Sequence, residues 1–443
     1  MKHIWLYISK ADLDTERRQC EEEGRDLSSV EIEFARLAEC DLDDPANQRA
    51  AEQLLDRTID LPIKAGYAYI EPSDLEGIKA ARGPQPSIHA LSLSDDALFD
   101  RLHGAWLGRC CGCLLGKPVE GWKRPRLLGY LNDTGRYPLS YYLSIDVPEE
   151  IREKYQMRPD YQWAETITAM TEDDDTNYTT IGMVLMKQKG RDFTPTDMAT
   201  FWMQNVPVLH TCTAERVAYR NFCQLIAPPQ SGSHRNPYRE WIGAQIRADF
   251  FGYAAPGNPE LAAEYAWRDA CISHVKNGIY GEMFVAAMIA TAFVCDDIPT
   301  IIRSGLAQVP ARSRLVEAVE RVLGWREEGK SYDKVVDLVH ATWDENSPHD
   351  WCHTISNAMV VAVGLLWGEL DYEKSITRAV QPCFDTDCNG ATVGSIVGTV
   401  LGAKRLPEKW TKPLNDTLHT GVAGYNVVKI SDMARESLAI ARS

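Results

Sequence analysis

The chain has 443 residues, enough for one large domain or for two or three smaller ones. Its formal net charge is −16, and it contains no basic run that could neutralise a phosphate backbone, so we expect no nucleic-acid partner. The apolar runs 283–295 and 358–368 are too short to cross a bilayer, and no signal-peptide pattern opens the sequence, so we expect a cytoplasmic protein that makes no membrane contact.

Residues 1–88 are polar, acidic and mostly helical in pattern. We expect Leu37, Leu54 and Leu55 to anchor this part, and Ser73 to be the N-cap of a short helix. Residues 83–87 have the composition of a linker. The sequence therefore predicts an N-terminal extension over 1–88, whose role no motif indicates, and a main domain over 89–443.

The main domain opens with a helix that carries a glycine at every fourth position. Ser94 supplies the expected cap, and the glycines are Gly104, Gly108, Gly112 and Gly116. Because four residues are a little more than one helical turn, these glycines form a stripe along which another backbone can approach closely. Pro118 ends the helix and leaves Glu120 on a loop.

A second stripe of the same spacing stands near the end of the chain, at Gly390, Gly394, Gly398 and Gly402. It directly follows Asp385 and Asp387, so both carboxylates lie at a helix N-terminus, where the helix dipole favours negative charge. The two glycine-striped helices are plausible packing partners.

A second acidic helix start, Asp173-Asp174-Asp175, precedes an apolar run. Taken alone, an acidic triplet before a helix is most often a solvated N-cap, and Asp385 with Asp387 could equally be a cap. If they converge with Glu120, six carboxylates would need the counter-charge of about two hard cations such as Mg²⁺. Glu120 would then act as general acid or base, or as a ligand that moves aside when substrate binds.

The rest of the chain adds buried helices over 278–294 and 355–366, an irregular region over 123–162, and few alternating stretches, so we expect an almost wholly α-helical protein. The twelve cysteines are expected to be reduced. Cys110, Cys111 and Cys113 lack a second ligand pair at a zinc-site spacing. His353 is expected to be structural rather than cleft-facing, and Trp122 to stack on a base or sugar or else to pack in the core.

Together these motifs resemble the ADP-ribosylglycohydrolase family, of the dinitrogenase-reductase-activating type, over residues 95–403. Gly104 to Gly116 with Pro118 and Glu120 match the first family motif. The later motifs match Asp174-Asp175-Thr176, then the 243–247 loop, then Ser273-His274, and finally Asp385-Thr386-Asp387-Cys388 with its glycines.

The resemblance implies a compact, orthogonal all-α fold with two Mg²⁺ ions in a central cleft. The implied activity is hydrolysis of a ribosyl C1–N or C1–O bond, in a small-molecule or protein-linked substrate. Glu120 and Asp174 are the implied catalytic residues. The implied metal ligands are Asp173, Asp174, Asp175, Asp385, Asp387 and Cys388. The implied substrate contacts are Gly243, Gln245, Arg247, Asp249, His274 and Phe384.

Departures from the family pattern open alternatives. Cys388 replaces a threonine or serine and is a poorer ligand for Mg²⁺, whereas Asp173 replaces a threonine and adds charge, which leaves Mn²⁺ or Ca²⁺ open. Phe384 is expected to narrow the pocket, and Asp249 to disfavour a pyrophosphate. The alternative functions are therefore an N-glycosidase or nucleoside-type hydrolase acting on a small ribosylated metabolite, and a non-catalytic relative that binds an ADP-ribose-like ligand.

Overall fold

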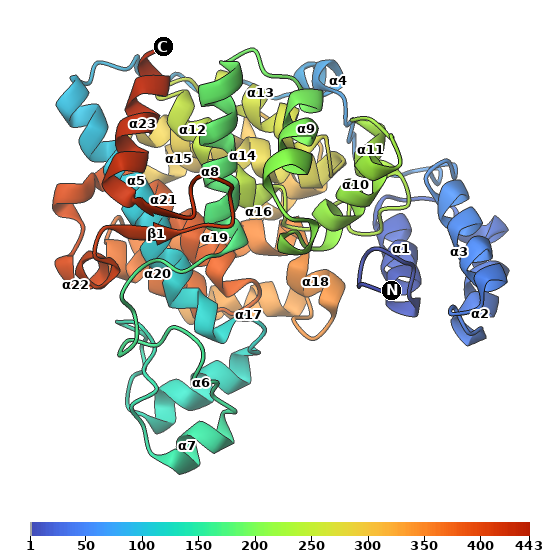
Figure 1. Cartoon of the computed structure of the whole chain (residues 1–443), viewed down its shortest axis with the longest axis horizontal. Helices are drawn as coiled ribbons and strands as arrows, with labels where there is room; N and C mark the ends of the chain where they lie inside the picture. The colour runs from blue at the N-terminus through green and yellow to red at the C-terminus, as the bar shows by residue number, and fades with distance from the viewer. Residues whose placement is uncertain (1) are drawn as a thin grey trace.

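The computed structural model describes residues 2–443, and the all-α prediction is confirmed, because the fold is built from helices with one small two-stranded sheet (Figure 1). In the N-terminal part the helices are α1 (Lys10–Glu22), α2 (Glu31–Glu39), α3 (Pro45–Thr58) and α4 (Leu75–Ala81). The strands β1 (Thr417–His419) and β2 (Val427–Lys429) pair in antiparallel register. Among residues 2–443 we find no helix with the length and apolarity needed to span a membrane.

The centre of the main domain is made of helices whose residues are buried almost all round. They are α5 (Asp95–Gly116), α8 (Asp174–Lys189), α14 (Lys276–Ala292), α19 (Thr354–Gly368) and α21 (Thr386–Leu401). Further helices surround this core: α9 (Pro195–Asn205), α10 (Thr213–Cys223), α11 (Gln230–Ser233), α12 (Asp249–Ala254), α13 (Pro259–Ala270), α15 (Ile298–Leu306), α16 (Arg314–Glu327), α17 (Tyr332–Thr342), α18 (Pro348–Cys352), α20 (Tyr372–Val380), α22 (Glu408–Thr411) and α23 (Ile430–Arg442).

The sequence suggested that the region 123–162 is irregular, but the structure has two helices there. It contains α6 (Arg124–Asp133) and α7 (Glu149–Lys154), which project from the main body as a lobe (Figure 1). Pro125 stands in the first turn of α6, where a missing backbone N–H costs nothing. Short helices among tyrosines and prolines give little periodic signal, which explains the difference.

The two glycine-striped helices pack against each other along their stripes, as predicted. A Cβ atom on Gly108 would overlap the carbonyl group of Gly394, and one on Gly112 would overlap that of Gly390. Side chains larger than hydrogen would therefore push α5 and α21 apart. At the end of this contact, Gly116 lies against the backbone of Thr386 and Asp387, which places the start of α21 beside the end of α5.

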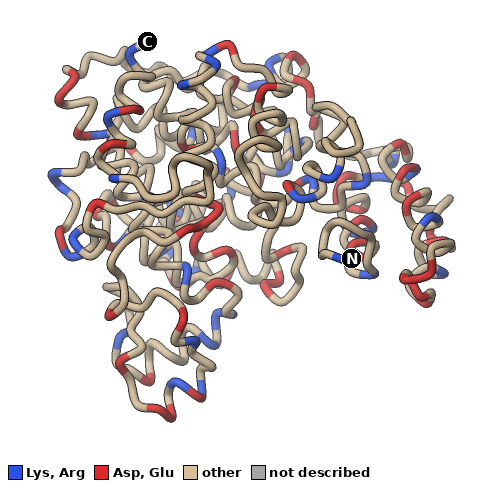
Figure 2. The backbone as a smooth tube through the Cα atoms, in the orientation of Figure 1, with Lys and Arg blue, Asp and Glu red and all other residues tan. Residues whose placement is uncertain are grey.

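The N-terminal helices α1, α2 and α3 have a small apolar core of their own, separate from that of the main domain, and it includes the predicted anchors Leu37, Leu54 and Leu55. Figure 2 shows acidic and basic residues interspersed over this segment. Ser73 is not the predicted cap of α4, because Asp74 accepts from the Gly77 amide instead. The Ser73 hydroxyl accepts from the Lys276 amide at 3.1 Å, so it joins this segment to the main domain.

Candidate active site

Acidic side chains from two helix starts meet at the end of the α5–α21 contact. Asp173 is the N-cap of α8 and Asp385 is the N-cap of α21. Two groups of ligand atoms form there, and within each group the atoms lie within 4.8 Å of one another. One group contains Cys113, Asp173, Asp175 and Asp387, and the other contains Asp385, Asp387 and Cys388. Asp387 belongs to both groups, so its carboxylate is the centre of the cluster.

Three buried oxygens in this cluster have no hydrogen-bond partner among the described residues: Oδ2 of Asp175, Oδ1 of Asp385 and Oδ1 of Asp387. Unpartnered buried carboxylate oxygens are costly unless a cation or a proton compensates them. The donor set therefore fits a hard, oxygen-preferring divalent cation. The thiols of Cys113 and Cys388 suit such a cation poorly, and burial raises the pKa of both.

Asp173 is already engaged on both oxygens. Its Oδ1 accepts from the Asp175 amide at 3.1 Å, and its Oδ2 accepts from the Lys117 ammonium at 2.7 Å. Burial is the largest influence and acts to raise the pKa of Asp173, but the Lys117 charge together with the hydrogen bonds from Lys117 and the Asp175 amide outweighs it, so the net pKa shift is downward. Asp173 is thus a capping residue with its own counter-ion, whereas Asp175, Asp385 and Asp387 keep oxygens free for a cation.

A fully buried arginine holds Asp175 in place. The Arg109 guanidinium lies 2.9 Å from Asp175 Oδ1 and 2.7 Å from Asp249 Oδ2. It also donates to the Ile246 carbonyl at 2.6 Å. This arrangement turns one Asp175 oxygen toward Arg109 and leaves the other facing the cluster.

The crowding of carboxylates shifts their proton affinities upward. Burial, followed by repulsion from Asp173, raises the pKa of Asp387 to about 6. Burial and the charge of Asp387 raise the pKa of Asp385 well above its usual range, and burial with the charge of Asp173 does the same for Asp174. Repulsion from Asp387 is the largest cause of the raised pKa of Glu120. Without a cation, the site therefore retains protons that isolated carboxyls would release.

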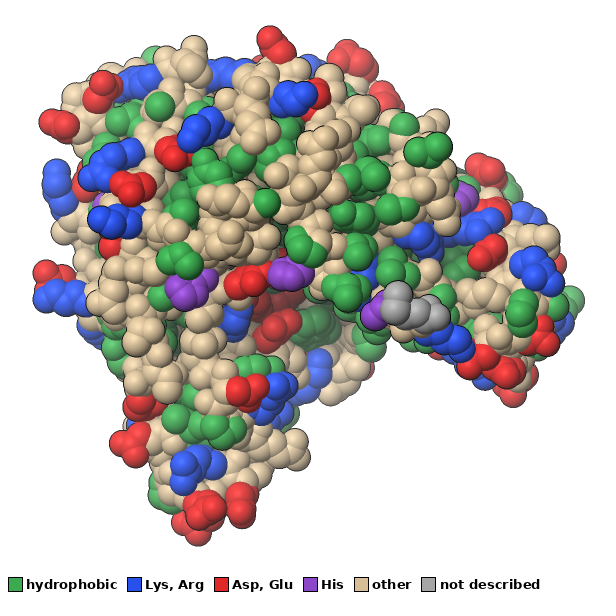
Figure 3. Space-filling view, in the orientation of Figure 1, with side chains coloured by type: hydrophobic (Ala, Val, Ile, Leu, Met, Phe, Trp, Pro, Cys, Tyr) green, Lys and Arg blue, Asp and Glu red, His purple; other side chains and the backbone are tan. Residues whose placement is uncertain are grey.

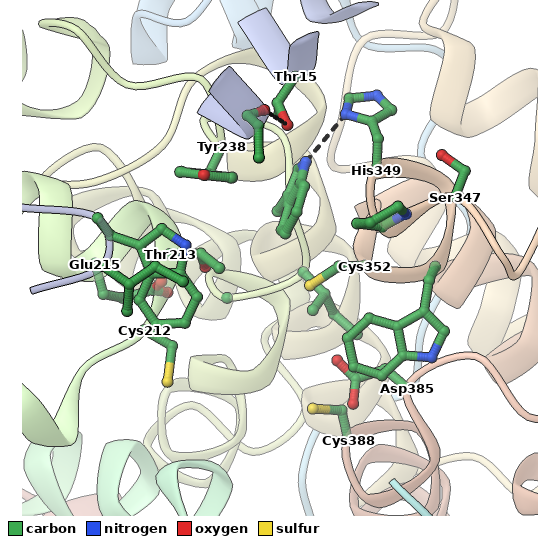
Figure 4. Close-up of a pocket in the computed structure, with 18 of the residues that line it drawn as sticks. Thr15, Cys212, Thr213, Glu215, Tyr238, Ser347, His349, Cys352, Asp385 and Cys388 are labelled. Atoms are coloured by element: carbon green, nitrogen blue, oxygen red, sulfur yellow. Dashed lines mark hydrogen bonds between the residues drawn. The ribbon is translucent and has the colours of Figure 1, made fainter. Parts of the chain in front are cut away.

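A cavity of about 690 Å³ adjoins the cluster, and Glu120, Asp174, Asp385, Asp387 and Cys388 line one part of it. Figure 3 shows acidic side chains in the recess between the main body and the α6–α7 lobe. In Figure 4, Asp385 and Cys388 lie at the bottom of the drawn cavity, with Cys212, Thr213 and Glu215 on one side and Ser347 and His349 on the other. The acidic cluster thus opens onto a space large enough for a small ligand.

The predicted substrate contacts divide into two groups. Gly243 lines the cavity, whereas Gln245, Arg247, Asp249, His274 and Phe384 do not. Arg247 is buried and pairs with Glu215 at 2.8 Å and with Asp269 at 2.5 Å. Asp249 pairs with Arg109, which corrects the expectation that its charge would face a pyrophosphate.

The other three residues are buried as well. Gln245 is fully buried, and the Ser273 hydroxyl lies 2.8 Å from Nδ1 of the buried His274. Phe384 packs against the His340 ring at 4.9 Å between centroids. It does not line the cavity and so does not narrow it, contrary to the expectation from the sequence. All three side chains are thus buried and do not line the cavity.

Several lining or supporting residues were missed from the sequence. Lys117 and Arg109 carry the two counter-charges, Glu215 lines the cavity, and Cys113 lies within the acidic cluster. A buried arginine within a small-residue helix was the one sequence signal available, because a charge in that position needs a partner.

Two open alternatives are decided by packing. Trp122 is 5% exposed and packs on Tyr130 and Tyr155 at 6.2 and 6.4 Å, in the core. His353 is fully buried, and its Nδ1 accepts from the Ile355 amide at 3.1 Å, as an N-cap of α19. Its Nε2 lies 3.4 Å from Glu22 of α1, so it joins the two parts of the chain.

Comparison with known proteins gives one family match. The family model described as ADP-ribosylglycohydrolase matches residues 94–441. A solved structure named "ADP-ribosylglycohydrolase-related protein complex" is 19% identical with a TM-score of 0.49, and the match covers 78% of this chain and 99% of that chain. The search among curated proteins gave no match.

Proposed function

Because this chain belongs to the ADP-ribosylglycohydrolase family, we propose that it is a divalent-cation-dependent hydrolase that cleaves a ribosyl C1–N or C1–O bond. The observation that carries the proposal is the group of buried, unpartnered oxygens on Asp175, Asp385 and Asp387 beside the cavity. Such a group is costly in a folded protein unless a cation binds there.

Asp175, Asp385 and Asp387, joined by Asp174 from the cavity side, would hold the cation. When bound, the cation would lower the pKa of a coordinated water and orient the substrate. Two groups of ligand atoms sharing Asp387 are compatible with two ions, and the oxygen donors favour Mg²⁺, with Mn²⁺ or Ca²⁺ as alternatives.

Glu120 is the residue that we assign to proton transfer. It lies at the exposed edge of the cavity on the loop after α5. The negative charges of Asp387 and Asp174 are among the causes that raise its pKa. Its raised pKa favours the protonated carboxyl more than in a free glutamate, so it is suited to donate a proton to the leaving atom or to take one from the attacking water. Arg109 and Lys117 pair with Asp175 and Asp173 and do not line the cavity, so we assign them a positioning role.

A second candidate substrate class is a small ribosylated metabolite without a diphosphate. The specific observation in its favour is that Arg247, the predicted contact for the rest of an ADP-ribosyl group, is turned away from the cavity.

All twelve cysteines are unbridged, which supports a reducing compartment such as the cytoplasm.

Replacing the central carboxylates tests the function. Asp385→Asn and Asp387→Asn should reduce riboside cleavage to background and remove the rise in melting temperature that Mg²⁺ or Mn²⁺ produces, because each removes an anionic ligand. Asp432→Asn, an exposed carboxylate on α23, is the matched control and should retain both properties. Unchanged cation-dependent melting shifts in the first two variants would contradict the proposal, and ligand binding without turnover at any cation would favour a non-catalytic relative.

A further inference from the structure

The cavity is closed on one side by residues that precede the family-matched region. Trp5, Asp14, Thr15 and Arg18, from the start of the chain and α1, are among its lining residues. In Figure 4, Thr15 and Tyr238 stand across the cavity from Asp385 and Cys388. The N-terminal segment is therefore placed to meet the part of a ligand that lies farthest from the acidic cluster.

We propose that this wall is the recognition face for the leaving group, and that the leaving group is a planar aromatic ring without phosphate. The inference rests on the proposed function, because it identifies the far end of the cavity as the place of the group that the ribosyl C1 atom releases. Residues 4–18 would then determine which ribosides the enzyme accepts.

Aromatic side chains concentrate at this end of the cavity. Trp5 and Tyr238 meet edge to face with ring centroids 6.5 Å apart, and Tyr238 meets Trp241 at 4.6 Å. Trp241 donates from Nε1 to His349 Nδ1 at 3.1 Å, which fixes its ring (Figure 4). Trp351 also lines the cavity. Aromatic walls of this kind bind flat rings by stacking, with little demand for particular hydrogen bonds.

The charges in the cavity disfavour a phosphate. Among the lining residues that the structure describes, Arg18 is the sole lysine or arginine. Its guanidinium is already paired with Glu22 at 2.7 Å and lies 3.4 Å from Asp350. Since Asp14 and Glu215 add negative charge to the lining, a diphosphate at this end would meet no unpaired lysine or arginine and several carboxylates.

The wall is held firmly against the main domain. The Arg216 guanidinium lies 4.7 Å from the Trp5 ring centroid and 3.4 Å from the Ile4 carbonyl oxygen. Trp5 has a φ of +66°, a conformation that side-chain-bearing residues adopt only when their surroundings hold them there. Asp12 of α1 accepts from the Tyr238 hydroxyl at 2.5 Å. A wall fixed by these contacts can discriminate between ligands by shape.

The experiment uses full-length Trp5→Ala, with Ile32→Ala as the matched control. Ile32 is 83% exposed on α2 of the same segment and does not line the cavity. Substrates are phenyl and methyl ribofuranosides, each as both anomers. Trp5→Ala should raise KM for the phenyl riboside roughly tenfold and leave kcat for this substrate unchanged. KM and kcat for the methyl riboside should both stay unchanged. Trp5→Phe, which keeps an aromatic ring, should remain within about threefold of the parent protein.

Calorimetric binding of adenosine and ADP-ribose separates this inference from the proposed function. Adenosine should bind, ADP-ribose should bind no tighter, and Trp5→Ala should weaken adenosine roughly tenfold. Equal behaviour of Trp5→Ala and Ile32→Ala in both assays, or ADP-ribose binding tenfold tighter than adenosine, would overturn the inference. If no riboside is cleaved but adenosine binding still depends on Trp5, the recognition face is supported and the proposed hydrolase activity fails.

Discussion

Asp387 is the residue on which the acidic cluster is centred. It belongs to both groups of ligand atoms, and its pKa is raised to about 6, chiefly by burial. Because its pKa in the folded chain exceeds that of an unfolded aspartate, the folded state binds the proton more tightly. Without a cation, this residue's contribution to the free energy of unfolding therefore decreases as the pH rises from about 4 to about 6.

Cation binding should show the opposite dependence on pH, because a cation requires ionised carboxylates. The increase in melting temperature caused by Mg²⁺ should be several degrees larger at about pH 7.5 than at about pH 5, as measured by differential scanning fluorimetry. Asp432→Asn should reproduce the parent profile, since this carboxylate is exposed and belongs to neither group of ligand atoms. Equal Mg²⁺ shifts at both pH values would show that protons and cations do not compete for these oxygens.

From the sequence it was easier to predict which carboxylates come together than to predict the directions in which the neighbouring side chains point. Glu120, Asp174, Asp385 and Asp387 were predicted, and the structure places all four along one cavity. Which way Arg247 and Asp249 point was not predictable, because their direction depends on partners far away in the sequence. Arg247 turns toward Asp269 and Asp249 toward Arg109, in each case to neutralise a buried charge.

Among the elements, α5 and α21 determine where the carboxylates lie. Their contact is made by backbone atoms, with Gly104, Gly108 and Gly112 facing Gly398, Gly394 and Gly390. The position of Asp387, in the first turn of α21, therefore depends on a distance that no side chain can adjust. This pairing was predictable from the sequence, because glycine at every fourth position weakens a helix unless another backbone packs along the stripe.

A single methyl group should disturb this contact. Gly112→Ala should destabilise the protein by about 1–3 kcal/mol, because the new Cβ would overlap the Gly390 carbonyl. It should also weaken the Mg²⁺-dependent rise in melting temperature, because the start of α21 would move. Both effects can be measured by thermal denaturation with and without Mg²⁺.

Gly324→Ala provides a control of opposite sign. Gly324 lies in α16, and a Cβ there would meet nothing within 4 Å. The substitution should stabilise the protein by up to about 1 kcal/mol through helix propensity and leave the Mg²⁺ response unchanged. A stabilising Gly112→Ala substitution would mean that the two helices are not in backbone contact.

At the scale of the whole molecule, buried ion pairs attach the N-terminal segment to the main domain. Arg239 of the main domain is 1% exposed and contacts Glu16 at 2.5 Å and Glu23 at 2.7 Å, both on or next to α1. Glu23 also meets Lys276 at 2.7 Å. These buried ion pairs cross the interface, so breaking one should loosen the segment and not merely remove a surface contact.

Arg239→Met should destabilise the protein by about 3–5 kcal/mol, because Glu16 and Glu23 would keep buried charge with too little compensation. Chymotrypsin should then cut more rapidly within residues 2–88, as mass spectrometry of the fragments would show. Arg235→Met removes a half-exposed pair with Asp56 and Glu52 and should cost about 1 kcal/mol or less. Similar cleavage rates for the two variants would mean that Arg239 does not anchor the segment.

The sequence predicts that this segment ends at residue 88 and contains no motif that indicates its role. Gly83 to Ser87 is an irregular connection between α4 and α5, as its composition had predicted. Trp5 and Asp385 line one cavity because the N-terminal segment packs on a distant part of the chain, and no local pattern encodes that packing. The family match begins at residue 94, and the division at residue 88 remains a prediction.

Because Trp5 and Thr15 precede the residues that match the family, two relatives could agree at every carboxylate and still differ at the opposite wall. Alignments restricted to the shared helices would then sort such proteins by the bond that they break. The residues before the matched region would distinguish them by the molecule in which that bond occurs. Substrates assigned from the common region alone would then be the same for enzymes that act on different molecules.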